Sequence, residues 1–221
     1  MRLALFDLDH TLIPFDSGHR WIGWLSERGI LSPGAPDEYL EACRDYATGQ
    51  LDIRSLHRTT VAPLGRFERH EIDTWLQRFA EHIEPALPAV ARGWVHAHQA
   101  NGDTCVLVTA TTRFIAEVFG RAFGVDHVLA TEPETDAQAG HRFTGEVTGL
   151  PCFREHKPAH VQAWLARHGR TWADVERSFF YSDSINDLPL LEAVTDPVVV
   201  HPDPRLLAEA ERCGWPVRMR G

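Results

Sequence analysis

A short apolar run near the start of the chain, Leu3 to Phe6, ends abruptly in two aspartates, Asp7 and Asp9. Buried parallel strands typically read as such short, continuous apolar runs. Because side chains alternate along a strand, both carboxylates would point to the same side. Open α/β sheets bind their ligands beyond the carboxyl ends of the strands. The pattern therefore indicates either two carboxylates gathered around a positive charge or simply an acidic turn after a strand.

Similar short apolar runs recur along the chain, separated by helical patterns. Further strands are predicted at Cys105 to Val108, His127 to Ala130, Ser178 to Tyr181 and Pro197 to Val200, with an edge strand at Trp215 to Met219. Helices are predicted at Pro88 to Ala100, Arg113 to Phe123, His156 to His168, Asn186 to Ala193 and Pro204 to Cys213. Residues 131–149 carry the polar and glycine punctuation of a β-hairpin. Strands that alternate with helices predict an α/β fold with a doubly wound, Rossmann-like parallel sheet.

A helical block interrupts this alternation directly after the first strand. Residues 15–85 contain about four apolar stripes at helical spacing, with enough aromatic residues for a small bundle. The sequence therefore predicts a core made of residues 1–14 and 86–221, with an inserted α-helical cap domain of residues 15–85.

The composition argues against several kinds of partner. The net charge of −9 is unlike that of a protein that binds nucleic acid through a broad basic face. The cysteines lack zinc-type spacing, no apolar stretch approaches the roughly 20 residues of a membrane span, and the acidic N-terminal segment is unlike a signal peptide. We expect a cytoplasmic protein with neither nucleic acid nor membrane as partner, and the sequence leaves the oligomeric state open.

Aspartates, a threonine and a lysine lie directly after the predicted strands or in a segment that leads into one. They are Asp7 and Asp9 after the first strand, Thr109 after the second, Lys157 before the fourth, and Asp183 and Asp187 after the fourth. Carboxylates, a lysine and a hydroxyl that converge on a strand-end crevice suit a divalent cation together with a phosphate. Asp7, Asp183 and a backbone carbonyl near Asp9 would offer Mg²⁺ the oxygen ligands that it prefers.

In this order and spacing, these residues resemble the four motifs of the haloacid dehalogenase superfamily phosphatases. The motifs are the segments Asp7 to Thr11 and Asp183 to Asp187, with Thr109 and Lys157 between them. The helical insert and the run that follows Asp183 resemble the phosphoserine-phosphatase-like branch, and the resemblance spans essentially the whole chain. It implies a Mg²⁺-dependent hydrolase that acts on a phosphate monoester of a small metabolite.

The resemblance implies a role for each motif. Asp7 would attack phosphorus in line and form an aspartyl-phosphate intermediate. Asp9 would protonate the leaving alkoxide and then deprotonate the hydrolytic water, a task that a dehalogenase would not need. Thr109, Lys157 and the backbone amides that follow Asp7 and Thr109 would stabilise charge on the phosphoryl oxygens.

A metal site and its surroundings are implied as well. Asp7, Asp183 and Asp9 would hold Mg²⁺, Asp9 through its backbone carbonyl. Asp187 would hold a metal-bound water or orient Lys157.

The substrate would be recognised under the cap. Asp16 falls where phosphoserine phosphatases carry an acid that contacts the substrate ammonium, although it could also simply cap the first cap helix. Thr11, Ala110 and Arg113 are the other residues that we expect to contact the substrate.

Residues 109–113, Thr-Ala-Thr-Thr-Arg, depart from the family pattern. Phosphoserine phosphatases have Ser-Gly-Gly here, and its backbone helps to hold the substrate carboxylate. A carboxylate would now need a cation from Arg54, Arg58 or Arg113. An amino-alcohol phosphate such as histidinol phosphate would keep the amine and dispense with the carboxylate. Three cap aromatics would then either stack on its ring or belong to the core: Phe15, Trp21 and Trp24.

The leading hypothesis is thus hydrolysis of an amino-acid or amino-alcohol phosphate, of the phosphoserine or histidinol phosphate type, in amino-acid biosynthesis. One alternative is phosphotransfer to an alcohol acceptor, which would yield a new phosphate ester in place of free phosphate. Another is a catalytically silent, regulatory phosphate-binding protein, although no motif residue is missing.

Overall fold

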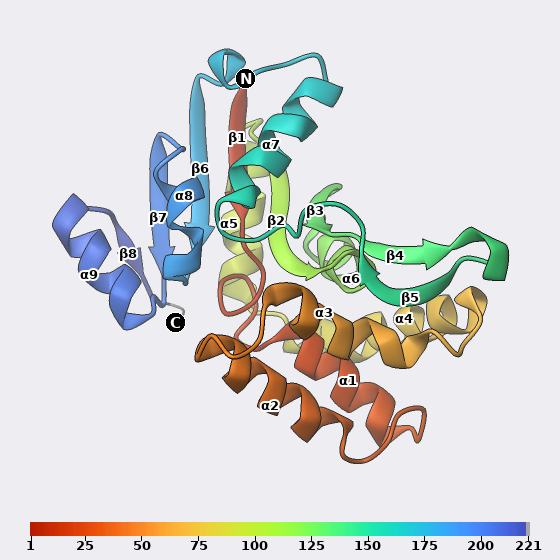
Figure 1. Ribbon diagram of the computed structural model, residues 1–221. Coiled ribbons are helices and arrows are strands. Elements are labelled where there is room, and N and C mark those ends of the chain that lie inside the picture. The colour runs from red at the N-terminus through yellow and green to blue at the C-terminus, as the bar shows by residue number, and fades with distance from the viewer. Residues whose placement is uncertain (220–221) are drawn as a thin grey trace.

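The computed structural model describes residues 1–219, in which six parallel strands form the central sheet (Figure 1). The strands are β1 (Arg2–Phe6), β2 (Thr104–Thr112), β3 (His127–Thr131), β6 (Arg177–Ser182), β7 (Asp196–Val200) and β8 (Val217–Arg218). Their order is β3-β2-β1-β6-β7-β8, and each neighbouring pair is parallel. The predicted doubly wound α/β fold is confirmed.

The direction of winding reverses between β1 and β6. From β1 the chain adds β2 and β3 on one side, and it later returns to add β6, β7 and β8 on the other. The register pairs Phe6 with Leu107 of β2 and with Tyr181 of β6. The residues that follow β1 and β6 therefore meet at one edge of the sheet, at the kind of switch point where α/β sheets bind ligands.

Helices cover both faces of the sheet, as the alternating side chains of β1 require. Ala4 and Phe6 belong to one hydrophobic cluster, with α5 (Ala89–Ala100) and α6 (Arg113–Phe123). Leu3 and Leu5 belong to the other, with α7 (His156–Arg167), α8 (Leu188–Leu191) and α9 (Pro204–Cys213). Short 3₁₀ turns are η1 (Ala62–Leu64), η2 (Glu84–Ala86), η3 (Ala137–Ala139), η4 (Trp172–Asp174) and η5 (Ile185–Asp187). Within residues 1–219 no helix has both the length and the hydropathy to cross a bilayer.

Between β1 and α5 the chain forms four α-helices that lie beyond the carboxyl ends of the strands (Figure 1). They are α1 (Ser17–Glu27), α2 (Ala35–Ala47), α3 (Ile53–Val61) and α4 (Arg69–Ile83). Aspartates begin two of them: Asp16 accepts from the backbone N–H of His19, and Asp52 from that of Ser55, each at 2.7 Å. We refer to residues 15–85 as the cap.

The predicted hairpin in residues 131–149 is confirmed, and it leaves the sheet to pack on the cap. Its strands are β4 (Pro133–Asp136) and β5 (Arg142–Val147), which pair antiparallel. In Figure 1 the hairpin extends away from the sheet and over the cap helices. The hairpin thus supports the cap from the side of the core.

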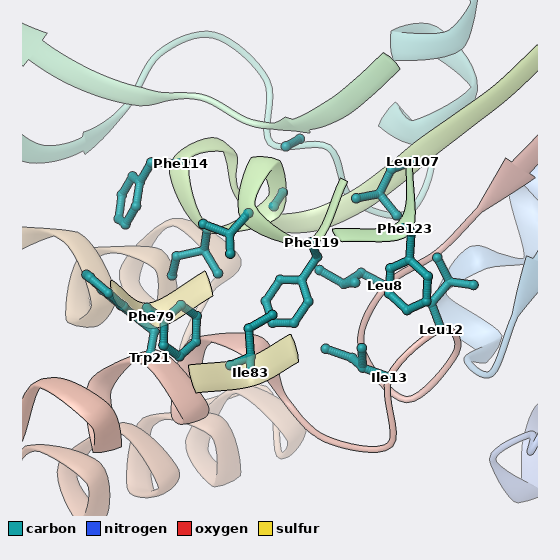
Figure 2. Close-up of a cluster of buried hydrophobic side chains, with 14 of the residues drawn as sticks. Leu8, Leu12, Ile13, Trp21, Phe79, Ile83, Leu107, Phe114, Phe119 and Phe123 are labelled. Atoms are coloured by element: carbon teal, nitrogen blue, oxygen red, sulfur yellow. The ribbon is translucent and has the colours of Figure 1, made fainter. Parts of the chain in front are cut away.

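The cap and the sheet share one hydrophobic cluster (Figure 2). Trp21 of α1 packs edge to face on Phe79 of α4, with 5.1 Å between ring centroids, and Phe79 lies 6.2 Å from Phe119 of α6. Leu8 and Leu12, from the segment after β1, lie in the same cluster. Apolar side chains therefore anchor the segment that bears the two aspartates.

Several predicted bounds differ from the structure, and the edge strand expected at Trp215 to Met219 is only the short β8. The second strand does not end at Val108 but continues to Thr112, because the backbone stays extended through an irregularity in its pairing with β3. The helix expected over residues 186–193 is instead η5 followed by the short α8. Pro189 stands in the first turn of α8 and has no N–H to donate to a preceding turn, which favours a new start of the helix at this point.

Candidate active site

Two aspartates meet where the winding of the sheet reverses: Asp7 follows β1, and Asp183 follows β6. Oγ1 of Thr11 lies 3.2 Å from Oδ2 of Asp7 and 3.2 Å from Oδ1 of Asp183. A hydroxyl has one proton, so it can donate to only one of these carboxylates at a time. Burial, followed by the charges of Asp7 and Asp187, raises the pKa of Asp183 to about 8. Asp183 therefore lacks a neighbouring positive charge.

A tight turn after β1 brings Thr11 back onto Asp7. The backbone N–H groups of residues 11–13 all donate to the carbonyl oxygen of Leu8, and His10 takes a left-handed φ of 56°. Thr11 is completely buried and does not line the cavity described below. Its hydroxyl joins the two aspartates, and we do not retain it as a substrate contact.

Lys157 is the cation of this cluster. It lies in the first turn of α7 and is 2% exposed, and its Nζ donates to Oδ1 of Asp7 at 2.8 Å and to Oδ2 of Asp187 at 2.7 Å. Asp187 also accepts from the Ser182 hydroxyl at 2.7 Å. Burial alone would lower the pKa of Lys157, but Asp187 and Asp7 outweigh burial and raise it above its usual value. Lys157 therefore stays positively charged, and its ammonium group lies next to the Asp7 carboxylate.

Asp9 lies against the start of the cap rather than against the lysine. Its Oδ1 accepts from the backbone N–H of Ser17 at 2.7 Å, and its Oδ2 accepts from the Thr111 hydroxyl at 2.7 Å. Burial and the charges of Asp16 and Asp7 raise the pKa of Asp9 to about 7, against the opposing effect of these hydrogen bonds. The two aspartates of one short segment thus stand in opposite electrostatic surroundings.

Strand β2 bulges beside these acids. Val108 pairs with Leu129 and Thr112 with Thr131, so residues 109–111 face a single residue of β3. Oγ1 of Thr109 accepts the backbone N–H of Thr111 at 3.2 Å, which leaves its O–H free to donate. Residues 109–112 line the cavity, so the bulge presents this hydroxyl and backbone polar groups to a ligand.

A cavity of about 470 Å³ separates the acids from the cap. Its floor is formed by Asp7, Asp9, Thr109, Ala110, Lys157, Asp183 and Asp187. Its cap wall is formed by Tyr39, Cys43, Tyr46 and Ala47 of α2 and by Ile53, Leu56, His57 and Thr60 of α3. The structure therefore gathers the predicted motif residues at one end of a single cavity.

Asp16 caps the first cap helix and also lies in the lining of the cavity. Its Oδ1 caps α1 and also accepts from the hydroxyl of Tyr39 at 3.0 Å. The side chain lines the cavity, and no residue of the described chain donates a hydrogen bond to its Oδ2. One carboxylate oxygen is thus structural, and the other remains available to a ligand.

None of the three arginines considered for a substrate carboxylate lines this cavity. Arg113 pairs with Glu132 and lies at a different surface hollow, so we do not retain it as a substrate contact. Arg58 pairs with Glu146 of β5 at 2.7 Å, and Arg54 donates to the carbonyl of Val147 at 3.2 Å. These partners hold all three guanidinium groups away from the cavity.

Trp21 and Trp24 belong to the core and not to the cavity, and Phe15 packs against the same cluster. The aromatics that do line the cavity are Tyr39, Tyr46 and Phe153, which the sequence did not single out for this role, nor did it single out His57 and Thr111. Tyr39, Cys43 and Tyr46 recur at helical spacing, but spacing alone does not tell a core face from a cavity face.

The residues at the floor fit a magnesium ion. No group of three or more His, Cys, Asp or Glu side chains within residues 1–219 is arranged to hold a metal. Asp7 and Asp183 offer two side-chain ligands, and Mg²⁺ in proteins commonly binds one or two carboxylates and keeps several waters. Both carboxylates lie within hydrogen-bond distance of one hydroxyl, that of Thr11. The raised pKa of Asp183 indicates that this carboxylate lacks a neighbouring positive charge, which a bound cation would supply.

A sequence model of the haloacid dehalogenase-like hydrolases matches residues 4–192, which include both aspartates of the first motif and Lys157. The chain belongs to the haloacid dehalogenase-like hydrolase family. Among its relatives is a histidinol-phosphatase of Neisseria meningitidis serogroup C, 38% identical over 217 residues and 97% of each chain. A probable phosphatase of Mycobacterium tuberculosis is 30% identical over 97% of this chain and 74% of its own. This hydrolase is a phosphatase.

Solved structures share the fold of this phosphatase. A Bordetella pertussis Tohama I protein of unknown function superposes with a TM-score of 0.90 at 41% identity, over 98% of this chain and 97% of its own. A substrate-bound phosphoserine phosphatase superposes with a TM-score of 0.68 at 16% identity, over 99% and 93%. The second likeness concerns the fold, including the helical insert after the first strand.

Proposed function

We propose that this phosphatase works through an aspartyl-phosphate on Asp7, with Asp9 as acid and base and with Mg²⁺ as cofactor. The observation that carries the proposal is the contrast between the two aspartates. Lys157 lies 2.8 Å from Asp7, whereas Asp9 has no cation among its hydrogen-bond partners and has a pKa raised to about 7. The first step needs an ionised nucleophile and a protonated acid at the same pH, and these surroundings favour that division.

In the first step a carboxylate oxygen of Asp7 forms a bond to phosphorus, and the ester P–O bond breaks. Asp9 gives its proton to the leaving oxygen, so an alcohol departs in place of an alkoxide. The Lys157 ammonium and the free O–H of Thr109 face the charge on the phosphoryl oxygens.

In the second step Asp9, now ionised, takes a proton from water as the water oxygen attacks phosphorus. The bond between phosphorus and Asp7 breaks, which restores the carboxylate and releases inorganic phosphate. The hydrogen bonds from Ser17 and Thr111 hold the Asp9 carboxylate in place for both transfers, at 2.7 Å each.

Asp7, Asp183 and the backbone carbonyl of Asp9 would hold Mg²⁺, which when bound neutralises charge on the transferring phosphoryl group. We expect phosphate release to stop on chelation and to return with Mg²⁺. Asp7→Asn should lower kcat by roughly 10⁴-fold or more. Asp37→Asn, which removes an exposed carboxylate from α2, is the matched control and should leave kcat unchanged. Activity retained in Asp7→Asn would show that another group is the nucleophile.

As substrate we propose a small amino-alcohol phosphate of the histidinol phosphate type. Lys157 is the only lysine or arginine that lines the cavity within residues 1–219, and two carboxylates already engage it. A substrate carboxylate would therefore lack a cation, whereas an ammonium group would meet the open oxygen of Asp16. The 38% identity to a histidinol-phosphatase supports the same choice.

A panel of phosphate esters tests this substrate class. We expect kcat/KM for histidinol phosphate to exceed that for phosphoserine at least roughly tenfold, because phosphoserine brings an unpaired carboxylate among acids. Asp16→Asn keeps a good helix cap but removes the charge, so it should lower kcat/KM for amine substrates without unfolding α1. A preference for phosphoserine would contradict the proposal. The same reactions, run with added alcohols, would reveal phosphotransfer as new phosphate esters.

We further propose that residues 15–85 act as a cap domain on a core of residues 1–14 and 86–221. Support comes from the cavity, whose floor belongs to the core and whose opposite wall belongs to α2 and α3. The cap would then recognise the alcohol part of the substrate, and the core would carry out the chemistry.

A further inference from the structure

One imidazole in the cap wall has no hydrogen-bond partner. His57 of α3 lines the cavity and is 7% exposed, and neither of its ring nitrogens is hydrogen-bonded to any residue of the described chain. His98 is buried to a similar extent, with 8% exposed, but both of its ring nitrogens have partners. Its Nδ1 lies 2.7 Å from Oδ2 of Asp103, and its Nε2 lies 2.9 Å from the hydroxyl of Tyr181. Buried polar groups are normally paired, so His57 calls for a functional explanation.

The two nitrogens of His57 differ in access. Nε2 is shut off from solvent, so Nδ1 is the nitrogen that can reach a molecule in the cavity. Burial lowers the pKa of His57 to about 4, so the ring is neutral near pH 7. A neutral imidazole offers Nδ1 as either a donor or an acceptor, according to its tautomer. His57 can thus form one hydrogen bond with a ligand without adding charge.

The residues around His57 form a wall that fits a substrate with an aromatic ring. Ile53, Leu56 and Thr60 lie on the same face of α3, and Tyr39 and Tyr46 of α2 complete the wall. A largely apolar and aromatic wall, whose hydrogen-bonding groups (His57 and the hydroxyls of Tyr46 and Thr60) are all neutral, matches a planar heteroaromatic ring better than a flexible charged chain. A phosphate held at the floor directs its alcohol part toward this wall, because the wall closes the opposite side of the cavity.

We propose that His57 is a specificity-determining residue, whose Nδ1 hydrogen-bonds a ring nitrogen in the alcohol part of a heteroaromatic amino-alcohol phosphate. This inference rests on the proposed function, since it assigns to the cap the task of reading the ring. An imidazole ring is a suitable partner, because it presents at least one N–H in either protonation state. The substrate would supply the partner that Nδ1 lacks, while the buried Nε2 stays unpaired and remains a cost to folding.

The test compares two phosphate esters that both carry an amine, of which only histidinol phosphate has a ring. His57→Phe keeps a planar ring but removes both nitrogens, and His57→Asn keeps a polar atom near the position of Nδ1. We expect His57→Phe to lower kcat/KM for histidinol phosphate roughly tenfold, to change that for phosphoethanolamine less than about twofold, and to leave the Tm equal or higher. His57→Asn should recover part of the loss. His70→Asn, at an exposed position of α4, is the control.

A purely structural His57 would give a different result. Its replacement by Phe would lower the Tm and reduce kcat/KM for both esters by the same factor, which would overturn the inference. If the wild type hydrolyses histidinol phosphate and His57→Phe leaves the ratio of the two esters unchanged, the inference alone fails. If the wild type does not hydrolyse histidinol phosphate, the proposed substrate fails, and this inference fails with it.

Discussion

At the scale of single residues, the proposed chemistry depends on how differently the chain surrounds two aspartates that are two positions apart. Lys157 donates to Asp7 at 2.8 Å, while Asp9 accepts only from a backbone N–H and a hydroxyl. A hydrogen bond from a buried ammonium stabilises a carboxylate far more than one from a hydroxyl. In the proposed mechanism the lysine would therefore make Asp7, and not Asp9, the nucleophile.

The role proposed for Asp9 predicts a dependence on the leaving group. Asp9→Asn should slow the first step for an alkyl phosphate by roughly 10²–10⁴-fold, because an alkoxide leaves poorly without a proton. It should slow p-nitrophenyl phosphate much less, because that phenolate leaves without protonation. Since the second step also loses its base, rapid quenching should detect a burst of p-nitrophenolate followed by slow turnover. An equal loss in the burst phase for both esters would contradict the role of Asp9 as an acid.

At the scale of elements, the hairpin β4–β5 shapes the cavity without lining it. Glu146 and Val147 of β5 engage Arg58 and Arg54 of α3, so these guanidinium groups stay away from the substrate. The face of α3 that remains toward the cavity carries His57 instead of a cation. If the proposed substrate class is right, the hairpin would thereby help to select substrates that lack a carboxylate.

The hairpin and the cap are in such close contact at Gly65 that adding one methyl group there should destabilise the protein. A Cβ on Gly65, just after η1, would lie 2.6 Å from the carbonyl oxygen of Phe143, although its φ of −61° suits any residue. Gly65→Ala should therefore lower the free energy of unfolding by about 1–3 kcal/mol. Gly23→Ala is the matched control: its Cβ meets nothing within 4 Å inside α1, so it should raise that free energy by up to about 1 kcal/mol. Urea denaturation measures both, and equal effects would contradict the contact.

At the scale of the whole molecule, the acid cluster opposes folding when no cation is bound. Burial is the first cause that raises the pKa of each of three aspartates: Asp9 to about 7, Asp183 to about 8 and Asp187 to about 6. A carboxyl group whose pKa is higher in the folded than in the unfolded state favours folding while it is protonated. Stability is therefore lost as the pH rises through the folded-state values.

This linkage predicts how pH and Mg²⁺ act together. The Tm of the metal-free protein should fall between pH 7 and pH 8.5, by roughly 2–4 °C for each kcal/mol lost. The comparison stays above pH 6.5, because the lowered pKa of His57 acts in the opposite direction below that value. Mg²⁺ should raise the Tm more at pH 8.5 than at pH 7, since it binds the ionised pair. Asp183→Asn should flatten both trends, and a Tm that rises with pH would contradict the prediction.

Several features could be predicted from local sequence, because they depend on short-range patterns. The apolar run Leu3 to Phe6 made β1, the alternation of its side chains divided them between the two faces, and Asp7 and Asp9 followed it at the carboxyl edge. Parallel strands bring their carboxyl ends together, so Lys157 and Asp183 could be expected at the same place.

Tertiary structure alone decided which residues of the cap line the cavity. A helical stripe such as that of α3 marks a buried face, but it does not say whether core or cavity lies opposite. Arg58 stays out of the cavity because Glu146, 88 residues away in the sequence, pairs with it. The aromatic side chains of α1 pack into the shared core for the same kind of reason, since α4 and α6 meet them there. The sequence by itself determined which polar residues gather at the carboxyl edge, because most of them directly follow a strand. The packing of distant elements decided which residues form the cap wall of the cavity.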